Sequence, residues 1–370
     1  MYFKQILNED AGCSSYVIAS RESKEAVVVD PALDVSQYVE LARRRDFHIV
    51  LAIDTHIHAD HISGARLLAE QTGAQVAMHE SADVLFPIRK LSDREVIPLG
   101  QLKLEVWHTP GHRPEGISLL VTNPPRGESV SLVITGDSLF VGDVGRPDFG
   151  GTEGASQQYD SVQRLLGLDD YVEVFPAHFE GSCGKGMCGR PSSTIGFERR
   201  FNPMVQLTRP DFTEAMSEAP AKPLNMTAIL ATNRGEADLS WAEPKVVESV
   251  DLLEVSEAAS WLTTEPATVI DVREPPEFAA GHLPGAISMP QSDVASRLDE
   301  LDRNEKYLVA CAGGVRSLRV VHFLKSIGFA RVVSLAGGTD GWISAGLAVE
   351  GAGKVALPHS GSDRYFHGSR

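Results

Sequence analysis

Short apolar runs and polar turns alternate along the first half of the chain. These runs are rich in Val, Ile and Tyr and end in Asp, His, Gly or Pro, which is typical of β-strands. We therefore predict strands over residues 14–20, 25–31, 48–56, 102–110, 131–140 and 171–178. Helical spacing of apolar positions predicts helices over residues 35–45, 62–72 and 159–168. Strands interleaved with helices indicate a layered α/β domain with a site at the strand ends.

The pattern changes after residue 208. Residues 209–247 have weak periodicity and scattered Pro, so we predict a partly helical connector that lies over the first domain, 1–208. A second α/β domain follows over residues 248–350, and we expect 351–370 to be a frayed tail. Within the second domain we predict three strands and two helices, over residues 267–274, 307–314 and 331–338, and 256–264 and 316–328.

Composition narrows the class of protein. The length of 370 residues favours two domains. The formal net charge of −16 argues against nucleic acid or an anionic membrane as the main ligand, although local basic residues can still bind small anions. No apolar run approaches the roughly 20 residues that a membrane helix needs, and the start lacks the pattern of a secretory signal. Four cysteines fit a reducing cytoplasm better than a disulfide framework.

The densest chemistry lies in the segment DTHIHADHIS, residues 54–63. If the preceding strand runs into a turn here, His56 and His58 project to the same side, and Asp60 and His61 open the next helix. Further ligand-type residues follow at the ends of later predicted strands, namely His112, Asp137 and His178. Imidazole and carboxylate groups suit zinc or non-haem iron, so the sequence predicts a metal site.

The order His-x-His-x-Asp-His, followed by a later His, an Asp and a His, resembles the metallo-β-lactamase superfamily over about residues 1–205. The resemblance implies an αββα sandwich with metals at one edge. Two-metal members use seven ligand positions, all filled here by His56, His58 and His112 for one metal, Asp60, His61 and His178 for the other, and Asp137 as the bridge. A two-zinc hydrolase such as hydroxyacylglutathione hydrolase therefore stays open.

The segments THIHADHISG, 55–64, and GDSLFVGDVGRPDF, 136–149, resemble one branch, the persulfide dioxygenases. That resemblance implies a single Fe(II) held by His56, His112 and Asp137, with open positions for substrate and O2. The other four candidates would then orient the ligands through hydrogen bonds, and they are His58, Asp60, His61 and His178.

The chain departs from glutathione-specific relatives in a glycine-rich segment over residues 179–203. This segment resembles bacterial dioxygenases fused to rhodanese, some of which use other small persulfides, so the natural persulfide stays open. Cys183 either relays sulfane sulfur or fills a tight loop. Arg146 is a candidate for contact with the anionic substrate.

A second constellation surrounds Cys311, which follows a predicted buried strand and precedes a helix in VACAGGVRS. The N–H groups of a tight loop and a helix N-terminus favour the thiolate, which is the reactive form. Arg316 could bind an anion such as thiosulfate or sulfite. A buried structural cysteine is the alternative interpretation. The intervening loop positions are Ala312, Gly313, Gly314 and Val315.

The flanking segments 271–288 and 335–342 are placed around Cys311 as in rhodaneses, and this resemblance covers about residues 248–350. It implies that Cys311 carries a persulfide during turnover, and that Asp271 and Arg273 hold the fold and the loop. The alternative for this domain is a docking module for a sulfur carrier.

The two resemblances together imply an enzyme of sulfide oxidation, a persulfide dioxygenase fused to a thiosulfate sulfurtransferase. We expect one Fe(II) per chain, with two zinc ions as the alternative. The expected partners are small persulfides, O2, and sulfite or thiosulfate, without nucleic acid or membrane, and a homodimer is compatible with the sequence. Fusion would raise the local concentration of the shared sulfur species.

Overall fold

The computed structural model describes residues 1–9, 12–147, 151–180, 186–216, 222–238, 251–265 and 267–351. The chain divides into two compact units, Met1–Trp241 and Ala242–Arg370, and each is described by itself. The predicted tail from residue 352, and the part of the predicted connector from residue 239, lie outside the described residues.

The first unit contains two six-stranded sheets, each with parallel and antiparallel pairs. The first sheet runs in the order β1 (Tyr2–Asn8), β2 (Cys13–Ala19), β3 (Glu25–Val29), β4 (His48–Ile53), β5 (Gln75–His79) and β6 (Arg89–Leu91). The second runs in the order β12 (Ser193–Thr194), β11 (Glu173–Pro176), β10 (Val130–Gly136), β9 (Ile117–Thr122), β8 (Leu102–His108) and β7 (Val96–Leu99).

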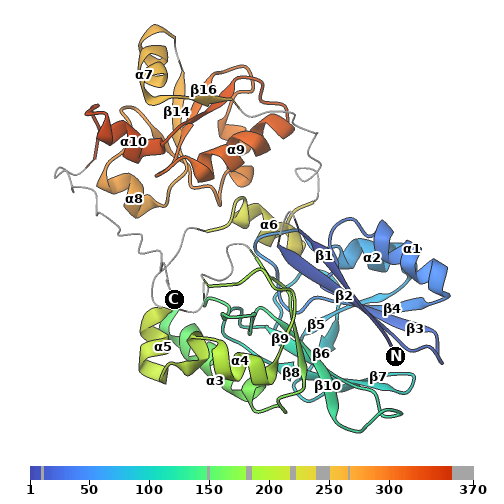
Figure 1. Cartoon of the computed structure of the whole chain (residues 1–370). Helices are drawn as coiled ribbons and strands as arrows, with labels where there is room; N and C mark the ends of the chain where they lie inside the picture. Colours follow the sequence, from blue (N-terminus) through green and yellow to red (C-terminus); the bar gives the residue numbers. More distant parts are fainter. Residues whose placement is uncertain are drawn as a thin grey trace, which may run out of the picture. The chain divides into compact units, whose positions relative to one another are not determined.

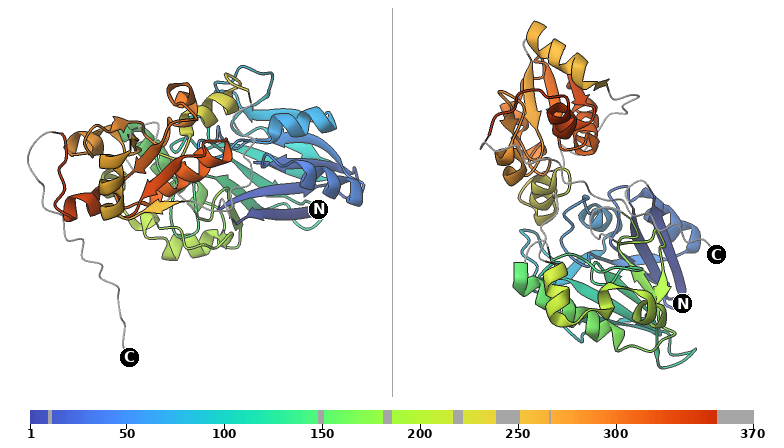
Figure 2. Two further views of the ribbon diagram at one scale, coloured as in Figure 1. Left: turned by 90° about the horizontal axis from the view of Figure 1, so that it is seen from above. Right: turned by 60° about the vertical axis from the view of Figure 1, so that its left-hand side comes forward.

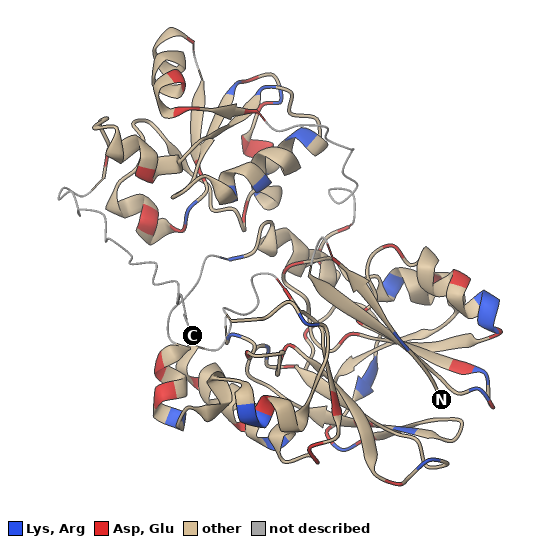
Figure 3. Cartoon of the chain, viewed as in Figure 1, with Lys and Arg blue, Asp and Glu red and all other residues tan. Residues whose placement is uncertain are grey.

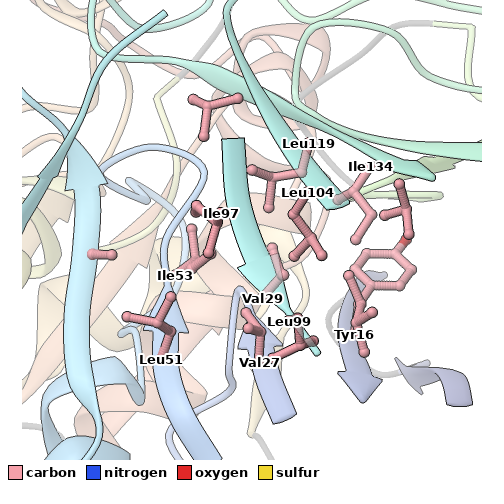
Figure 4. Packing of buried hydrophobic residues seen from close by; sticks show 14 of the residues in the cluster. Tyr16, Val27, Val29, Leu51, Ile53, Ile97, Leu99, Leu104, Leu119 and Ile134 are labelled. Carbon is pink, nitrogen blue, oxygen red and sulfur yellow. The ribbon is translucent and has the colours of Figure 1, made fainter. Parts of the chain in front are cut away.

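The two sheets pack face to face because alternate side chains of each strand point to opposite sides. In β3, Val27 and Val29 enter the core between the sheets, whereas Val28 faces the helices outside. Figure 4 shows side chains of this inner core, including Leu104 and Leu119 of the second sheet. Strands buried on both faces explain why the apolar runs in the sequence are almost continuous.

Helices cover the outer faces of both sheets (Figure 1, Figure 2). The first sheet is covered by α1 (Ser36–Arg45) and α2 (Ala65–Thr72). The second is covered by α3 (Gly151–Leu166), α4 (Ile195–Phe201) and α5 (Arg209–Ala215), with a 3-10 turn at Met204–Gln206. The predicted αββα sandwich is therefore confirmed. A further helix, α6 (Met226–Arg234), belongs to the same unit.

The C-terminus of α1 has a favourable distribution of charge. The last turn of α1 carries Arg43, Arg44 and Arg45, the blue end of this helix in Figure 3. These cations complement the partial negative charge at a helix C-terminus. No helix among the described residues has both the length and the apolar character that crossing a membrane would require.

The segment between β4 and α2 differs from the prediction. The strand β4 ends at Ile53 and α2 begins only at Ala65, so Asp60 and His61 do not open a helix. The reason is that the backbone here bonds to other elements: the Gly64 N–H donates to the Pro31 carbonyl at 2.7 Å. We call the segment at residues 54–64 the metal loop.

The second unit is a parallel sheet with helices packed against it, which confirms the predicted α/β class. The sheet has five strands among the described residues, two more than the sequence analysis predicts, because β13 and β15 are only two residues long. Its strands, in sheet order, are β13 (Leu252–Leu253), β17 (Val332–Leu335), β16 (Tyr307–Ala310), β14 (Thr268–Asp271) and β15 (Ile287–Ser288). Its helices are α7 (Val255–Thr264), α8 (Pro275–Ala280), α9 (Val315–Ser326) and α10 (Gly338–Ser344), with a 3-10 segment at Ala295–Glu300. The core is built on Val269, Leu308 and Leu335.

Candidate metal centre and candidate sulfur site

Three predicted ligands converge in the first unit. His56 lies in the metal loop, His112 lies between β8 and β9, and Asp137 follows β10; all three are buried. The Asp137 Oδ2 atom lies 3.8 Å from Nε2 of His56 and 3.5 Å from Nε2 of His112. Atoms bound to one ion lie roughly 3–4 Å apart, because each bond is about 2.1 Å long. These residues therefore fit a bound metal ion.

The hydrogen bonds of the two histidines decide which ring nitrogen faces that point. The Thr55 hydroxyl has one hydrogen and donates it to Asp30, so its oxygen accepts from Nδ1 of His56 at 3.0 Å. Nδ1 of His112 donates to the Arg146 carbonyl at 2.7 Å. In the neutral form of each ring, Nε2 is therefore the nitrogen whose lone pair is available to a metal.

The charges at this point also suit a cation. Burial raises the pKa of Asp137, but His178, together with His56 and His112, outweighs burial and holds that pKa below its usual value. Burial lowers the pKa of His56 well below its usual value, and the neighbouring His58 adds to this effect. A carboxylate beside a neutral imidazole is the protonation state that metal binding requires.

The other four candidates form a second group beside the first. Ligand-type atoms of His58, Asp60 and His61 come within 4.8 Å of one another. The fourth, His178, places Nδ1 at 2.8 Å from Asp137 and Nε2 at 2.7 Å from Asp60. All seven predicted residues thus lie together, and His178 links the two groups.

His58 differs from the other histidines in its bonding. Its Nε2 lies 3.1 Å from the Asp30 carboxylate, and its buried Nδ1 has no hydrogen-bond partner among the described residues. Burial lowers the pKa of His58, but the charge of Asp30 outweighs burial and raises that pKa to about 9. An additional ion could use this nitrogen once the ring has lost its proton.

Two acidic residues that the sequence analysis overlooked hold the metal loop. Asp30 accepts hydrogen bonds from the Thr55 N–H at 2.7 Å and from the Thr55 hydroxyl. The Oε1 atom of Glu115 accepts from the Ile57 N–H and from Arg113, both at 2.9 Å. The position of Asp30, directly after an apolar strand, could have indicated its role. Nothing in the sequence indicates that Glu115 contacts residue 57.

The two remaining candidates of the first unit are Arg146 and Cys183. Arg146 is buried and touches the centre through its carbonyl, which accepts from His112. Cys183 lies outside the described residues, so its two interpretations stay as the sequence left them.

In the second unit, Cys311 follows β16 and sits at the N-terminus of α9. Its side chain is buried, and its Sγ accepts from the N–H of Gly314 at 3.1 Å and of Ser317 at 3.4 Å. The predicted loop residues Ala312, Gly313, Gly314 and Val315 connect Cys311 to Ser317, and Gly314 has a φ of 96°. Two backbone donors and a helix N-terminus therefore face this sulfur.

Arg316 is held in place by a residue that the sequence analysis did not single out. Its guanidinium donates to both carboxylate oxygens of Glu277 on α8, at 2.8 and 2.6 Å. An anion that binds Arg316 must therefore share it with Glu277. Asp271 and Arg273 form a separate buried pair, with Nη2 2.7 Å from Oδ2, and Arg273 also donates to the Gly281 carbonyl.

The first turn of α10 closes over the backbone of the cysteine loop. The Thr339 N–H donates to the Cys311 carbonyl at 2.7 Å, and the Asp340 N–H donates to the Ala312 carbonyl at 3.1 Å. At Gly338, a Cβ atom would lie 2.2 Å from both carbonyl oxygens. A glycine is required there because any side chain would overlap the backbone.

Comparison with known proteins agrees with this two-part organisation. The family model of the metallo-beta-lactamase superfamily matches residues 9–178, and that of the rhodanese-like domain matches residues 254–345. The mitochondrial persulfide dioxygenase ETHE1 of Bos taurus is 29% identical over 225 residues, which are 57% of this chain and 78% of that protein.

Two solved structures resemble the chain. The structure of ETHE1 from Myxococcus xanthus is 30% identical with a TM-score of 0.56, and the match covers 64% of this chain and all of that chain. A metallo-beta-lactamase from Staphylococcus aureus is 28% identical with a TM-score of 0.63, covering 91% of this chain and 99% of that chain. The second match extends well beyond the residues of the first unit.

Proposed function

Because the chain belongs to the metallo-beta-lactamase superfamily and continues into a rhodanese-like domain, we propose that it is a persulfide dioxygenase joined to a sulfurtransferase. His56, His112 and Asp137 would hold one Fe(II), which supplies the activation of O2. The net reaction converts a small-thiol persulfide, O2 and water into the thiol, sulfite and two protons.

The observation that carries this proposal is the convergence of two Nε2 atoms and one carboxylate oxygen on a single point. Hydrogen bonds to Thr55 and to the Arg146 carbonyl fix both rings. His178 holds the other oxygen of Asp137. Three ligands fixed in this way leave the remaining positions of a metal ion to the persulfide and to O2.

In the second unit, we propose that the Cys311 thiolate attacks the outer sulfur of a persulfide or of thiosulfate. The S–S bond of the donor breaks, the thiolate or sulfite leaves with the electron pair, and the sulfur stays on Cys311 as a persulfide. The N–H groups of Gly314 and Ser317 would stabilise the charge on sulfur.

Free thiols at Cys13, Cys188 and Cys311 support the cytoplasm as the proposed location.

One observation favours a second candidate function, a two-zinc thioester hydrolase of the same fold. The second group of ligand-type atoms, together with the unpartnered Nδ1 of His58, could hold another ion beside the first. Asp137, which lies between the two groups, would then be available to both ions, and the pair would activate a water molecule for hydrolysis. This candidate predicts hydrolysis without O2.

Oxygen consumption separates the two candidates. Fe(II)-loaded full-length protein is given glutathione persulfide, cysteine persulfide and coenzyme A persulfide in turn, and O2 uptake and sulfite are recorded. The proposal predicts one sulfite for each O2 with at least one of these donors, and the preferred donor identifies the thiol. Absence of O2 uptake with all three, together with hydrolysis of a glutathione thioester by the zinc-loaded protein, would establish the second candidate instead.

A further inference from the structure

We propose that Asn233, on α6, is a positioning residue for the metal centre, and that the functional first domain therefore extends through α6. The inference rests on the metal site proposed above, although not on the reaction performed there. Asn233 lies beyond the first family match, which ends at residue 178, and beyond the boundary predicted at residue 208.

The Asn233 side chain bonds the metal loop at three backbone atoms. Its Nδ2 group donates to the carbonyl oxygens of His58 and His61, both at 2.9 Å, and its Oδ1 accepts from the Ser63 N–H at 3.0 Å. Asn233 is only 7% exposed, so these bonds form away from water. The three bonds cross more than 160 residues of sequence and hold the loop that carries His56.

The chemistry of these bonds requires an amide. A primary amide offers two N–H donors and one carbonyl acceptor, which match two carbonyls and one N–H of the loop. An aspartate of the same shape would place a buried negative charge against two carbonyl oxygens, and a leucine of similar volume would leave all three backbone groups unpaired. A residue that served only in packing would not require an amide group.

The helix that carries Asn233 is itself fixed to the first unit. Arg66, on α2, donates to the Thr232 carbonyl at 2.7 Å, and the Leu85 N–H donates to the Arg234 carbonyl at 2.8 Å. Ala228 and Ile229 of α6 are buried as well. The hydrogen bonds of α6 therefore position the amide, and the amide in turn positions the metal loop. Without these bonds, metal binding would also have to order the loop, and this cost would weaken the affinity for the metal.

Metal affinity tests the proposal directly. Asn233→Asp and Asn233→Leu are made in the full-length chain. The control is Asn225→Gly at the start of the same helix, because Asn225 has a φ of 58° that glycine adopts readily. Binding of Co(II), Fe(II) and Zn(II) to metal-free protein is measured by competition with a chromophoric chelator, and the Co(II) absorption spectrum reports the ligand geometry. We expect both Asn233 variants to bind about 10–100-fold more weakly, as for other residues that orient metal ligands, with an altered Co(II) spectrum, and Asn225→Gly to match wild type.

Wild-type affinity and spectrum in Asn233→Leu would overturn the proposal, because that variant has none of the three bonds. If Asn233→Asp does not fold, the leucine variant decides the question, with circular dichroism of the metal-free protein as the check on folding. The readout is independent of turnover: a wild-type protein that binds metal without taking up O2 contradicts the proposed reaction and leaves this inference standing.

Discussion

The histidines of the candidate metal centre differ in which ring nitrogen is hydrogen-bonded and which is left for a metal. His56 and His112 have both committed Nδ1 to hydrogen bonds, with Thr55 and with the Arg146 carbonyl, so both offer Nε2. His58 has the opposite arrangement, with Nε2 bound to Asp30 and Nδ1 free. The sequence shows that three histidines are close together, but it cannot show which nitrogen each one turns inward.

This difference predicts distinct effects of two substitutions. We expect His56→Ala to abolish stoichiometric iron binding, because it removes one of three ligands. We expect His58→Ala to retain one iron per chain with about 10–100-fold lower affinity, because His58 only orients its neighbours. Metal content per chain after loading and gel filtration measures both effects. A fall from two ions to one in His58→Ala would instead identify His58 as a ligand of a second metal.

The cysteines also differ at the residue scale. Cys13 is buried, and burial raises the pKa of its thiol to about 11, whereas Cys188 is exposed. Because only the thiolate reacts, we expect iodoacetamide at neutral pH to modify Cys188 rapidly and to leave Cys13 intact until the protein unfolds. Mass spectrometry of peptides from native and urea-unfolded protein measures this. Equal labelling of Cys13 and Cys188 in the native protein would contradict this difference between the two thiols.

At the scale of elements, apolar runs that end in polar turns predict nine strands correctly, because burial imposes that pattern on the chain. The same pattern misses other described strands, such as β1 and β9. It also fails in the metal loop, since α2 begins at Ala65 and not near residue 61. There the backbone is fixed by Asp30, Glu115 and Asn233, which are far away in sequence. Local patterns cannot indicate contacts of this kind.

The packing of the α10 N-terminus on the cysteine loop gives a prediction about two glycines. Gly338→Ala would place a Cβ 2.2 Å from the Cys311 carbonyl oxygen at a φ of 57°, whereas Gly341→Ala would meet nothing nearer than 3.4 Å. We expect Gly338→Ala to cost about 1–3 kcal/mol from backbone strain alone and to lose sulfur transfer. Gly341→Ala should keep both stability and activity. Thermal unfolding and a sulfurtransferase assay measure these effects, and equal behaviour of the two variants would contradict the packing described.

At the scale of the whole molecule, two units with separate candidate sites share one chain. Each unit has its own hydrophobic core, and each family model falls within one unit. The cysteine motif and the histidine motif are both local in sequence, which is why the sequence alone could indicate two chemistries. If the proposed functions hold, the first site would supply sulfite and the second would carry sulfane sulfur, which a sulfurtransferase can combine.

Separate sites predict separable activities. We expect Cys311→Ser to abolish sulfur transfer and to keep persulfide-dependent O2 uptake, because it removes only the nucleophile. We expect Asp137→Asn to do the reverse, because it removes a ligand of the candidate metal. Both assays are run on both variants in the full-length chain. Unchanged sulfur transfer in Cys311→Ser would mean that the second unit is a docking module and not an enzyme.

The central claim is a single Fe(II) held by His56, His112 and Asp137. The most direct test is an anaerobic titration of metal-free protein with Fe(II), followed by measurement of O2 uptake with a small-thiol persulfide at each step. We expect activity to rise linearly to one equivalent of iron per chain and then to stay constant, and zinc at one equivalent to inhibit it. Two tightly bound zinc ions per chain, with no O2 uptake at any iron loading, would contradict it.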